Sequence, residues 1–157
     1  DRLLEYLRGV HKQTQWTTSV CTGSILLAAA GLLEGLPATS HWYPHNLLKA
    51  YGARPVKSRV VREGKIITAA GVSAGIDMGL FLARQIHGDE QARIIQLMIE
   101  YDPDPPFADA GSAWRVDAGT LRQAKRRLEW ASLHWLRQKR ESLLKSLWDF
   151  MQLHLKS

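Results

Sequence analysis

The sequence predicts an α/β fold in which helices cover both faces of a parallel sheet. Two observations carry the prediction. Residues 17–33 have the pattern of a buried strand that passes through a tight turn into an apolar helix, and residues 59–68 have the pattern of a hairpin that leads into a second apolar helix. Strands that alternate with helices are typical of open α/β sheets. Only three or four strands can be counted in the 157 residues, so we expect further strands to precede Asp1.

The chain is expected to open with a helix. Apolar residues recur at three- and four-residue spacing over residues 1–11, with charged residues between them. The β-branched and small residues at 17–20 favour a buried strand. An apolar helix is predicted over residues 25–33, because Gly35 and Pro37 follow it and both are typical of helix ends.

Four more segments complete the compact part of the chain. A second short strand is predicted at residues 38–41, and the two strand-like runs of residues 59–68 meet at a Glu-Gly-Lys turn, as in a β-hairpin. Helices are predicted over residues 76–86 and 91–101. The Asp-Pro-Asp-Pro-Pro run at residues 102–106 breaks regular structure and is expected to end this part.

The last part of the chain has a helical pattern from Asp117 onward. Residues 120–123 have the spacing of a capping box, which marks a helix start. Apolar residues recur every seven positions in two series, Leu121, Leu128 and Trp135, then Leu136, Leu143 and Phe150. We therefore divide the chain into a partial α/β domain, residues 1–112, and a basic amphipathic helical tail, residues 113–157.

The formal charge of +6 belongs to the tail. Residues 1–110 hold eleven basic and eleven acidic side chains, whereas residues 111–157 hold ten basic and four acidic ones. A basic helix with an apolar stripe more often packs on its own body or on a dimer partner than on a ligand. Association with a membrane surface is conceivable only through this tail, where Trp130, Trp135 and Trp148 lie.

Composition restricts the class of protein. A hydrophobic content of 45% and a charged content of 23% are typical of a globular chain and exclude a disordered or collagen-like one. The longest apolar run, residues 25–33, is too short to span a bilayer. Cys21 is the only cysteine, so no disulfide can form within the chain, and we expect a reducing compartment, the cytoplasm.

The most informative stretch is Ser-Val-Cys-Thr-Gly-Ser at residues 19–24, between the predicted strand and helix. A nucleophile on such a sharp turn has a strained backbone, and its neighbours two residues away must be small, as Ser19 and Gly23 are. The start of the helix favours the thiolate of Cys21, and the amide of Thr22 is placed to donate to an oxyanion. The alternative is a structural cysteine, because free cysteines are often buried.

A cysteine nucleophile needs a base, and His41 is the candidate. It lies twenty residues after Cys21, at the end of the strand predicted at 38–41, where catalytic groups of open α/β sheets gather. A purely structural role is the alternative. The remaining candidates, which we expect at the surface, are His45, His87 and His134. No residues have the spacing of a metal site, and neither a metal nor another cofactor is expected.

Four ordered motifs resemble the ThiJ/PfpI superfamily, also called class I glutamine-amidotransferase-like. They are Thr-Ser-Val-Cys-Thr-Gly-Ser at residues 18–24, Ala-Thr-Ser-His-Trp at residues 38–42, the run at residues 64–78, and Ile-Glu-Tyr-Asp-Pro at residues 99–103. The Cys-Thr-Gly, Gly-Val-Ser-Ala-Gly-Ile-Asp and Glu-Tyr-Asp-Pro runs are most similar to the isonitrile-hydratase branch. The resemblance covers residues 1–112.

The resemblance implies a flavodoxin-like three-layer sandwich, usually a homodimer, that acts on a small-molecule substrate. In isonitrile hydratases the cysteine and an acidic residue near the N-terminus add water to an isonitrile to form an N-substituted formamide. Carried over, Cys21 is the nucleophile or proton-transfer centre, Thr22 supplies a hydroxyl and an amide, and His41 is the histidine near the thiol. The residues that match the surroundings of the substrate pocket are Gly23, Ser73 and Gly75.

The chain departs from the family pattern at its start. The family's first strands, the loop with the second oxyanion amide and the acidic partner all precede the helix that opens this chain. We therefore expect an N-terminally truncated domain with impaired activity.

Three other functions fit parts of the sequence less well. True glutamine amidotransferases need a His-x-Glu pair well downstream of the cysteine, and the nearest string, at residues 87–90, has different spacing. A transcriptional regulator with this fold as its ligand-sensing half needs paired helix-turn-helix units. The 47 residues after Ala110 are too few for them, so a nucleic acid partner is not expected. Stress-protective glyoxalase, deglycase or chaperone-like members usually have different residues around the cysteine and an early glutamate.

Overall fold

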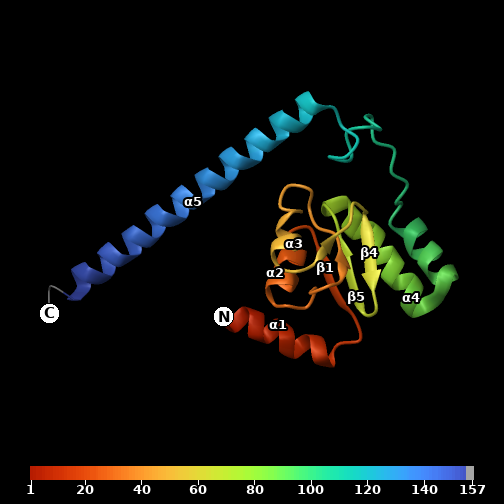
Figure 1. Ribbon diagram of the computed structural model, residues 1–157, viewed down its shortest axis with the longest axis horizontal. Helices are drawn as coiled ribbons and strands as arrows, with labels where there is room; N and C mark the ends of the chain where they lie inside the picture. Colours follow the sequence, from red (N-terminus) through yellow and green to blue (C-terminus); the bar gives the residue numbers. More distant parts are fainter. Residues whose placement is uncertain (155–157) are drawn as a thin grey trace. The chain divides into compact units, whose positions relative to one another are not determined.

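The computed structural model describes the backbone of residues 1–154 and the side chains of residues 1–139 other than Leu136. The chain divides into two compact units, Asp1–Ala108 and Asp109–Ser157. Figure 1 shows the elements along the chain. Some predictions rest on side chains that lie outside the described residues, namely those of Leu136, Leu143, Trp148 and Phe150.

The first three elements lie close to their predicted positions. Helix α1 (Arg2–Gln13) is slightly longer than predicted, and strand β1 (Thr17–Val20) has the predicted bounds. Helix α2 (Gly23–Ala29) ends before the predicted residue 33. The reason is Gly31, which adopts the left-handed conformation with a φ of +77° and turns the chain.

The main sheet contains three strands in the order β1-β5-β4. Strands β4 (Val60–Glu63) and β5 (Ile66–Ala69) form the predicted hairpin and are antiparallel, with Gly64 in the turn at a φ of +56°. Strand β5 is also parallel to β1. The sheet is therefore mixed rather than parallel throughout, because two strands joined by a tight turn can only run in opposite directions.

A second sheet of two strands includes the residues just before His41. Strand β2 (Pro37–Ala38) is parallel to β3 (Arg54–Pro55), and the short helix α3 (Leu47–Ala50) lies between them in the chain. The strand predicted at residues 38–41 is wrong beyond Ala38. Thr39 makes bonds outside a strand ladder: its amide donates to the Thr68 hydroxyl at 2.9 Å, and its own hydroxyl donates to a backbone carbonyl.

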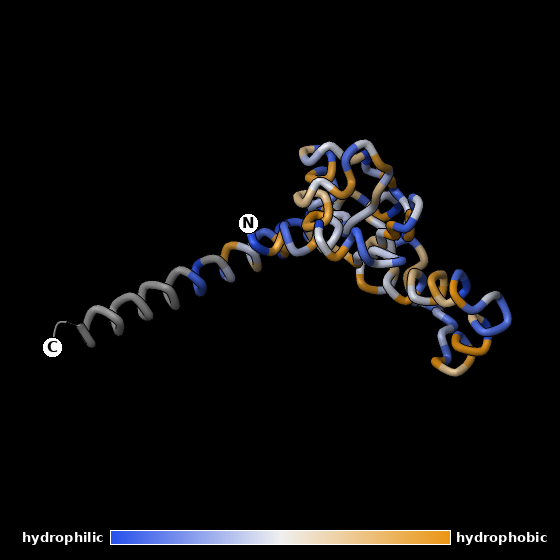
Figure 2. Tube along the Cα trace, turned by 90° about the horizontal axis from the view of Figure 1, so that it is seen from below, coloured by the Kyte–Doolittle hydropathy of each residue, from blue (hydrophilic) through white to orange (hydrophobic). Residues whose placement is uncertain are grey.

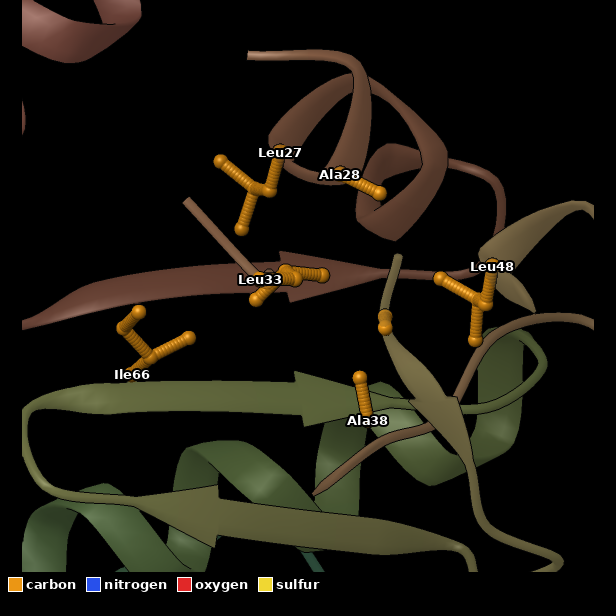
Figure 3. Close-up of a cluster of buried hydrophobic side chains, with 7 residues drawn as sticks. Leu27, Ala28, Leu33, Ala38, Leu48 and Ile66 are labelled. Carbon is orange, nitrogen blue, oxygen red and sulfur yellow. The ribbon is translucent and has the colours of Figure 1, made fainter. Parts of the chain in front are cut away.

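Helices cover both faces of the main sheet, as predicted. Successive residues of a strand face opposite sides, so Ile66 and Ile67 of β5 belong to different hydrophobic clusters. Ile66 packs with α2 and neighbouring segments, in the cluster of Leu27, Ala28, Leu33, Ala38, Leu48 and Ala53 (Figure 3). Ile67 packs with helix α4 (Val72–Met98), in the cluster of Ala69, Ala74 and Met78. The α/β architecture with α2 and α4 on opposite faces is visible in Figure 1.

Helix α4 is bent at Gly88, whose φ of +86° and ψ of 174° lie outside the helical region. The part before Gly88 begins at Val72, four residues before the helix predicted at residues 76–86, so residues 72–75 are helical rather than part of a loop. The part after Gly88 corresponds to the helix predicted at residues 91–101. The second part ends at Met98, earlier than predicted, because Glu100 adopts a left-handed φ of +50° and turns the chain.

The second unit contains helix α5 (Ala118–His154). Oδ1 of Asp117 accepts the amides of Gly119 at 2.8 Å and Thr120 at 3.0 Å, so Asp117 caps the helix. The capping box predicted at residues 120–123 is therefore wrong, since the helix begins before it. Hydrophilic and hydrophobic residues alternate along the coloured turns of α5 (Figure 2). In the described part of the chain, no helix is both long and apolar enough to cross a membrane.

Candidate active site

Cys21 occupies the turn between β1 and α2 in a conformation that is rare for a residue with a side chain. Its φ is +60°, in the left-handed region. Among the described residues, only Cys21 and Glu100 combine a side chain with a positive φ. The backbone strain expected at this turn is therefore present at the cysteine itself.

Three hydrogen bonds hold the backbone of Cys21. Its amide donates to the carbonyls of Ala69 at 3.1 Å and Ala70 at 2.7 Å, at the end of β5. The hydroxyl of Ser40 donates to the carbonyl of Cys21 at 2.9 Å. The turn is thus tied both to the end of β5 and to the segment that leads to His41, while the thiol remains partly exposed.

The small residues around Cys21 have different roles. Ser19 and Ser24 are buried, and their hydroxyl oxygens lie 2.8 Å apart, which closes the turn from inside. A Cβ at Gly23 would lie 3.5 Å from the Cβ of Ser19, an ordinary contact distance, so packing does not require glycine there. Thr22 is exposed, and its side chain makes no capping bond to α2.

His41 lies three residues beyond β2 and packs near Gly71, where a Cβ would lie 3.7 Å from Cδ2 of the ring. Nδ1 of His41 accepts the amide of Tyr43 at 3.3 Å, so the neutral ring carries its proton on Nε2. Burial lowers the pKa of His41, which favours this neutral form. Within the described residues, no hydrogen bond joins His41 to the Cys21 thiol.

The prediction that the other histidines lie at the surface is wrong for His45. This side chain is only 5% exposed, and its Nε2 lies 3.1 Å from the carbonyl of Val56, which satisfies a ring nitrogen inside the fold. His87 and His134 are exposed, as expected, and His134 stacks on Trp130 with 5.1 Å between the ring centroids.

The segment at residues 71–75 lies beside the Cys21 turn. A Cβ at Gly75 would lie 3.1 Å from Cγ1 of Val20, so the first turn of α4 packs directly on the residue before the cysteine. The hydroxyl of Ser73 accepts a hydrogen bond from Nη2 of Arg59 at 3.3 Å. The structure therefore brings Gly75 and His41 to the elements around Cys21, while Ser73 is engaged by Arg59.

Three residues near the 71–75 segment interact with one another, and none of them was singled out as a site residue from the sequence. Nε of Arg59 donates to Oδ2 of Asp77 in an ion pair, and the hydroxyl of Tyr101 donates to Oδ1 of Asp77 at 2.6 Å. Asp77 and Tyr101 belong to two of the family-like motifs, which was the available signal. Nothing in the spacing of Arg59 pointed to it. In the part of the chain that the structure describes, no group of three or more His, Cys, Asp or Glu residues could hold a metal ion.

Several known proteins are similar to this chain in sequence and in fold. A sequence model of the DJ-1/PfpI family matches residues 1–85. The chain is 46% identical over 127 residues to isonitrile hydratase from Pseudomonas putida, a match that covers 81% of this chain and 55% of that protein. It is 36% identical over 92 residues to the HTH-type transcriptional regulator CdhR from Pseudomonas aeruginosa, covering 57% of this chain and 27% of the regulator. The crystal structure of a ThiJ/PfpI family protein from Pseudomonas syringae is 41% identical, with a TM-score of 0.75 over 80% of this chain and 52% of that one.

The chain thus spans about half the length of the hydratase and of the P. syringae protein. The family match covers more than half of this chain and includes the Cys21 turn, His41 and the start of α4. Sequence motifs and fold agree, and the chain belongs to the DJ-1/PfpI family.

Proposed function

We propose that the protein hydrates isonitriles through Cys21. The observation that carries the proposal is the left-handed φ of +60° at the strand-to-helix turn, which is the backbone form of a nucleophile elbow. Holding a residue with a side chain in this conformation costs about 1–2 kcal/mol, and backbone strain of this kind is concentrated at functional turns. The 46% identity to isonitrile hydratase supports the substrate class.

The proposed reaction needs water as its only co-substrate. The sulfur of Cys21 bonds to the terminal carbon of the isonitrile, and the thiol proton moves to that carbon, which gives a thioimidate, R–N=CH–S–Cys. Water then adds across the C=N bond, its oxygen to carbon and one of its protons to nitrogen. The C–S bond breaks, the hydroxyl proton passes to sulfur, and the product is the N-substituted formamide R–NH–CHO.

Thr22 and His41 are proposed to stabilise the charges that form in these steps. The amide of Thr22 directly follows the sulfur-bearing residue, where a donor lowers the energy of a charged intermediate. His41 is suited to donate through Nε2–H to the atom that gains negative charge. It is less suited to accept the thiol proton through Nδ1, because that nitrogen already accepts the Tyr43 amide.

The same proposal assigns the remaining family-like residues and the assembly. Gly23, Ser73 and Gly75 are assigned to the surroundings of the substrate site, and the homodimer is proposed as the working assembly. The cytoplasm is proposed as the compartment, since the single cysteine suits a reducing environment.

The test is turnover by protein expressed from its complete gene. Cyclohexyl isocyanide is supplied, and N-cyclohexylformamide is quantified by NMR. We expect the native protein to form the formamide, Cys21→Ser to lose nearly all turnover, and Gly79→Ala, at an open position of α4, to keep it. Undiminished turnover by Cys21→Ser would contradict a role for the thiol.

A ligand-sensing role in a transcriptional regulator is the second candidate, supported by the 36% identity to CdhR. It predicts that the protein binds the isonitrile without turning it over and shifts DNA in a salt-sensitive gel assay. Turnover of methylglyoxal in place of the isocyanide would instead favour a stress-protective member of the same family.

A further inference from the structure

Four side chains from distant parts of the chain form one hydrogen-bonded cluster. Arg59 precedes β4, Ser73 and Asp77 lie one turn apart near the start of α4, and Tyr101 follows α4. Both carboxylate oxygens of Asp77 are used, Oδ2 by the guanidinium of Arg59 and Oδ1 by the hydroxyl of Tyr101 at 2.6 Å. Arg59 also donates to Ser73, so its guanidinium bridges two residues on one face of α4.

The charges in this cluster are balanced. Burial raises the pKa of the Asp77 carboxyl, but the bonds from Tyr101 and Arg59 outweigh it and leave that pKa below its ordinary value. The bond to Asp77 raises the pKa of Arg59. At neutral pH the cluster is therefore an ion pair with charge-assisted hydrogen bonds, which are stronger than bonds between neutral groups.

The backbone of Arg59 connects this cluster to the cysteine. The carbonyl of Arg59 accepts the amide of Ala70 at 2.8 Å, and the carbonyl of Ala70 accepts the amide of Cys21 at 2.7 Å. The side chain of Arg59 holds the first turn of α4, which packs through Gly75 on Val20. One residue thus contacts both segments that support the Cys21 turn.

We propose that Arg59, Asp77 and Tyr101 form a clamp that holds the Cys21 turn in its left-handed conformation. They are positioning residues for the reactive thiol, and they act through Ala70 and the start of α4 rather than on the substrate. The inference rests on the proposed function only in taking Cys21 as the reactive group. The ion pair between Arg84 and Asp89 provides a matched comparison, because Asp89 lies on the same helix as Asp77 and also pairs with an arginine, but its side chain is 62% exposed, against 29% for Asp77.

The test is amide hydrogen exchange followed by NMR in the full chain, with Asp77→Asn, Arg59→Gln and Tyr101→Phe. We expect the amides of Cys21 and Ala70 to exchange roughly five- to tenfold faster in the first two variants and less so in the third, in line with the loss of a charge-assisted bond. In these variants the amide of Ile67, in the middle of β5, is expected to exchange at its native rate. In Asp89→Asn the amides of Cys21 and Ala70 are expected to exchange at their native rates. Arg59→Lys, which keeps the charge, is expected to restore part of the protection.

Two results would overturn the clamp. One is unchanged exchange at Cys21 in both Asp77→Asn and Arg59→Gln. The other is equal acceleration at Cys21 and Ile67, which would mean that the cluster only stabilises the fold as a whole. In the double variant Asp77→Asn/Arg59→Gln, exchange at Cys21 should be no faster than in the more affected single variant, because both changes break the same link.

Failure of this inference is distinguishable from failure of the proposed function. Exchange at Cys21 is measured without substrate, so it reports on the clamp alone. If formamide production depends on Cys21 but the Cys21 amide of Asp77→Asn exchanges at the native rate, the clamp is contradicted and the proposed reaction is not. If the Cys21 amide of Asp77→Asn exchanges faster but the protein never forms the formamide, the proposed reaction is contradicted and the clamp is not.

Discussion

The backbone of Cys21 leads to a prediction about stability. Glycine at this position removes the Cβ that disfavours a φ of +60°, whereas alanine keeps it. We expect the free energy of unfolding of Cys21→Gly to exceed that of Cys21→Ala by about 1 kcal/mol, measured by urea denaturation. Equal stability of the two variants would show that residue 21 is not strained.

The contact between Gly75 and Val20 can be tested by two parallel substitutions. A Cβ at Gly75 would lie 3.1 Å from Val20, whereas a Cβ at Gly79 of the same helix would meet nothing within 4 Å. Alanine favours a helix over glycine by about 1 kcal/mol, so Gly79→Ala should stabilise the protein, and Gly75→Ala should gain about 1 kcal/mol less. Equal gains in urea denaturation would mean that Val20 yields freely to the added methyl group.

The protonation of His41 should make stability depend on pH. Burial lowers its pKa in the folded state, so the unfolded chain binds the proton at a higher pH than the folded one. The contribution of neutral His41 to the free energy of unfolding is complete above the pKa of histidine in the unfolded chain, about 6.5. It is lost as the pH falls through the lower pKa of His41 in the folded protein. We expect the free energy of unfolding to fall less steeply below that pH in His41→Gln than in the native protein.

An exposed histidine provides the control for this pH experiment. His87→Gln, at an exposed position of α4, is measured in parallel as the control for replacing a histidine by glutamine. A native slope in His41→Gln would assign the acid sensitivity to other groups, such as His11, whose pKa burial also lowers.

At the scale of elements, the bend in α4 depends on one glycine. Gly88 has a φ of +86° and a ψ of 174°, a region that residues with a Cβ rarely adopt. We expect Gly88→Ala to lower the free energy of unfolding by about 1–3 kcal/mol, opposite in sign to Gly79→Ala. Because the bend precedes Tyr101, we also expect a weaker bond from Tyr101 to Asp77. A stabilised Gly88→Ala would mean that α4 can run straight.

Elements with a strong local pattern were predicted well, and short ones were not. The four residues of β1 and the hairpin of β4 and β5 have β-branched runs and a turn glycine, which act over a few residues. In contrast, β3 has two residues and α3 has four, too few to show a period. Their conformation follows from packing against β2 and its neighbours, which no local pattern records.

At the scale of the whole molecule, the division into an α/β domain, residues 1–112, and a basic helical tail, residues 113–157, remains a prediction for the protein in solution. Arg115 is exposed in the stretch between α4 and α5 that contains neither helix nor strand. We expect limited trypsin digestion to accumulate a fragment that ends at Arg115, because irregular exposed segments are cleaved fastest. The variant Arg115→Gln should slow its appearance. Early cleavage at Lys57, within the α/β domain, would contradict the division into domain and tail.

The sequence by itself determined the α/β class, the turn at Cys21 and the family, because strand propensity, small residues and helix starts are set by neighbours along the chain. Only the tertiary structure decided that the sheet is mixed, that Nδ1 of His41 is occupied, and that Asp77 meets Arg59 and Tyr101. Those last partners lie 18 and 24 residues from Asp77 in the chain. Contacts at such separations depend on how the sheet, the bend in α4 and the turn at Glu100 return the chain to one place, and propensity carries no information about that.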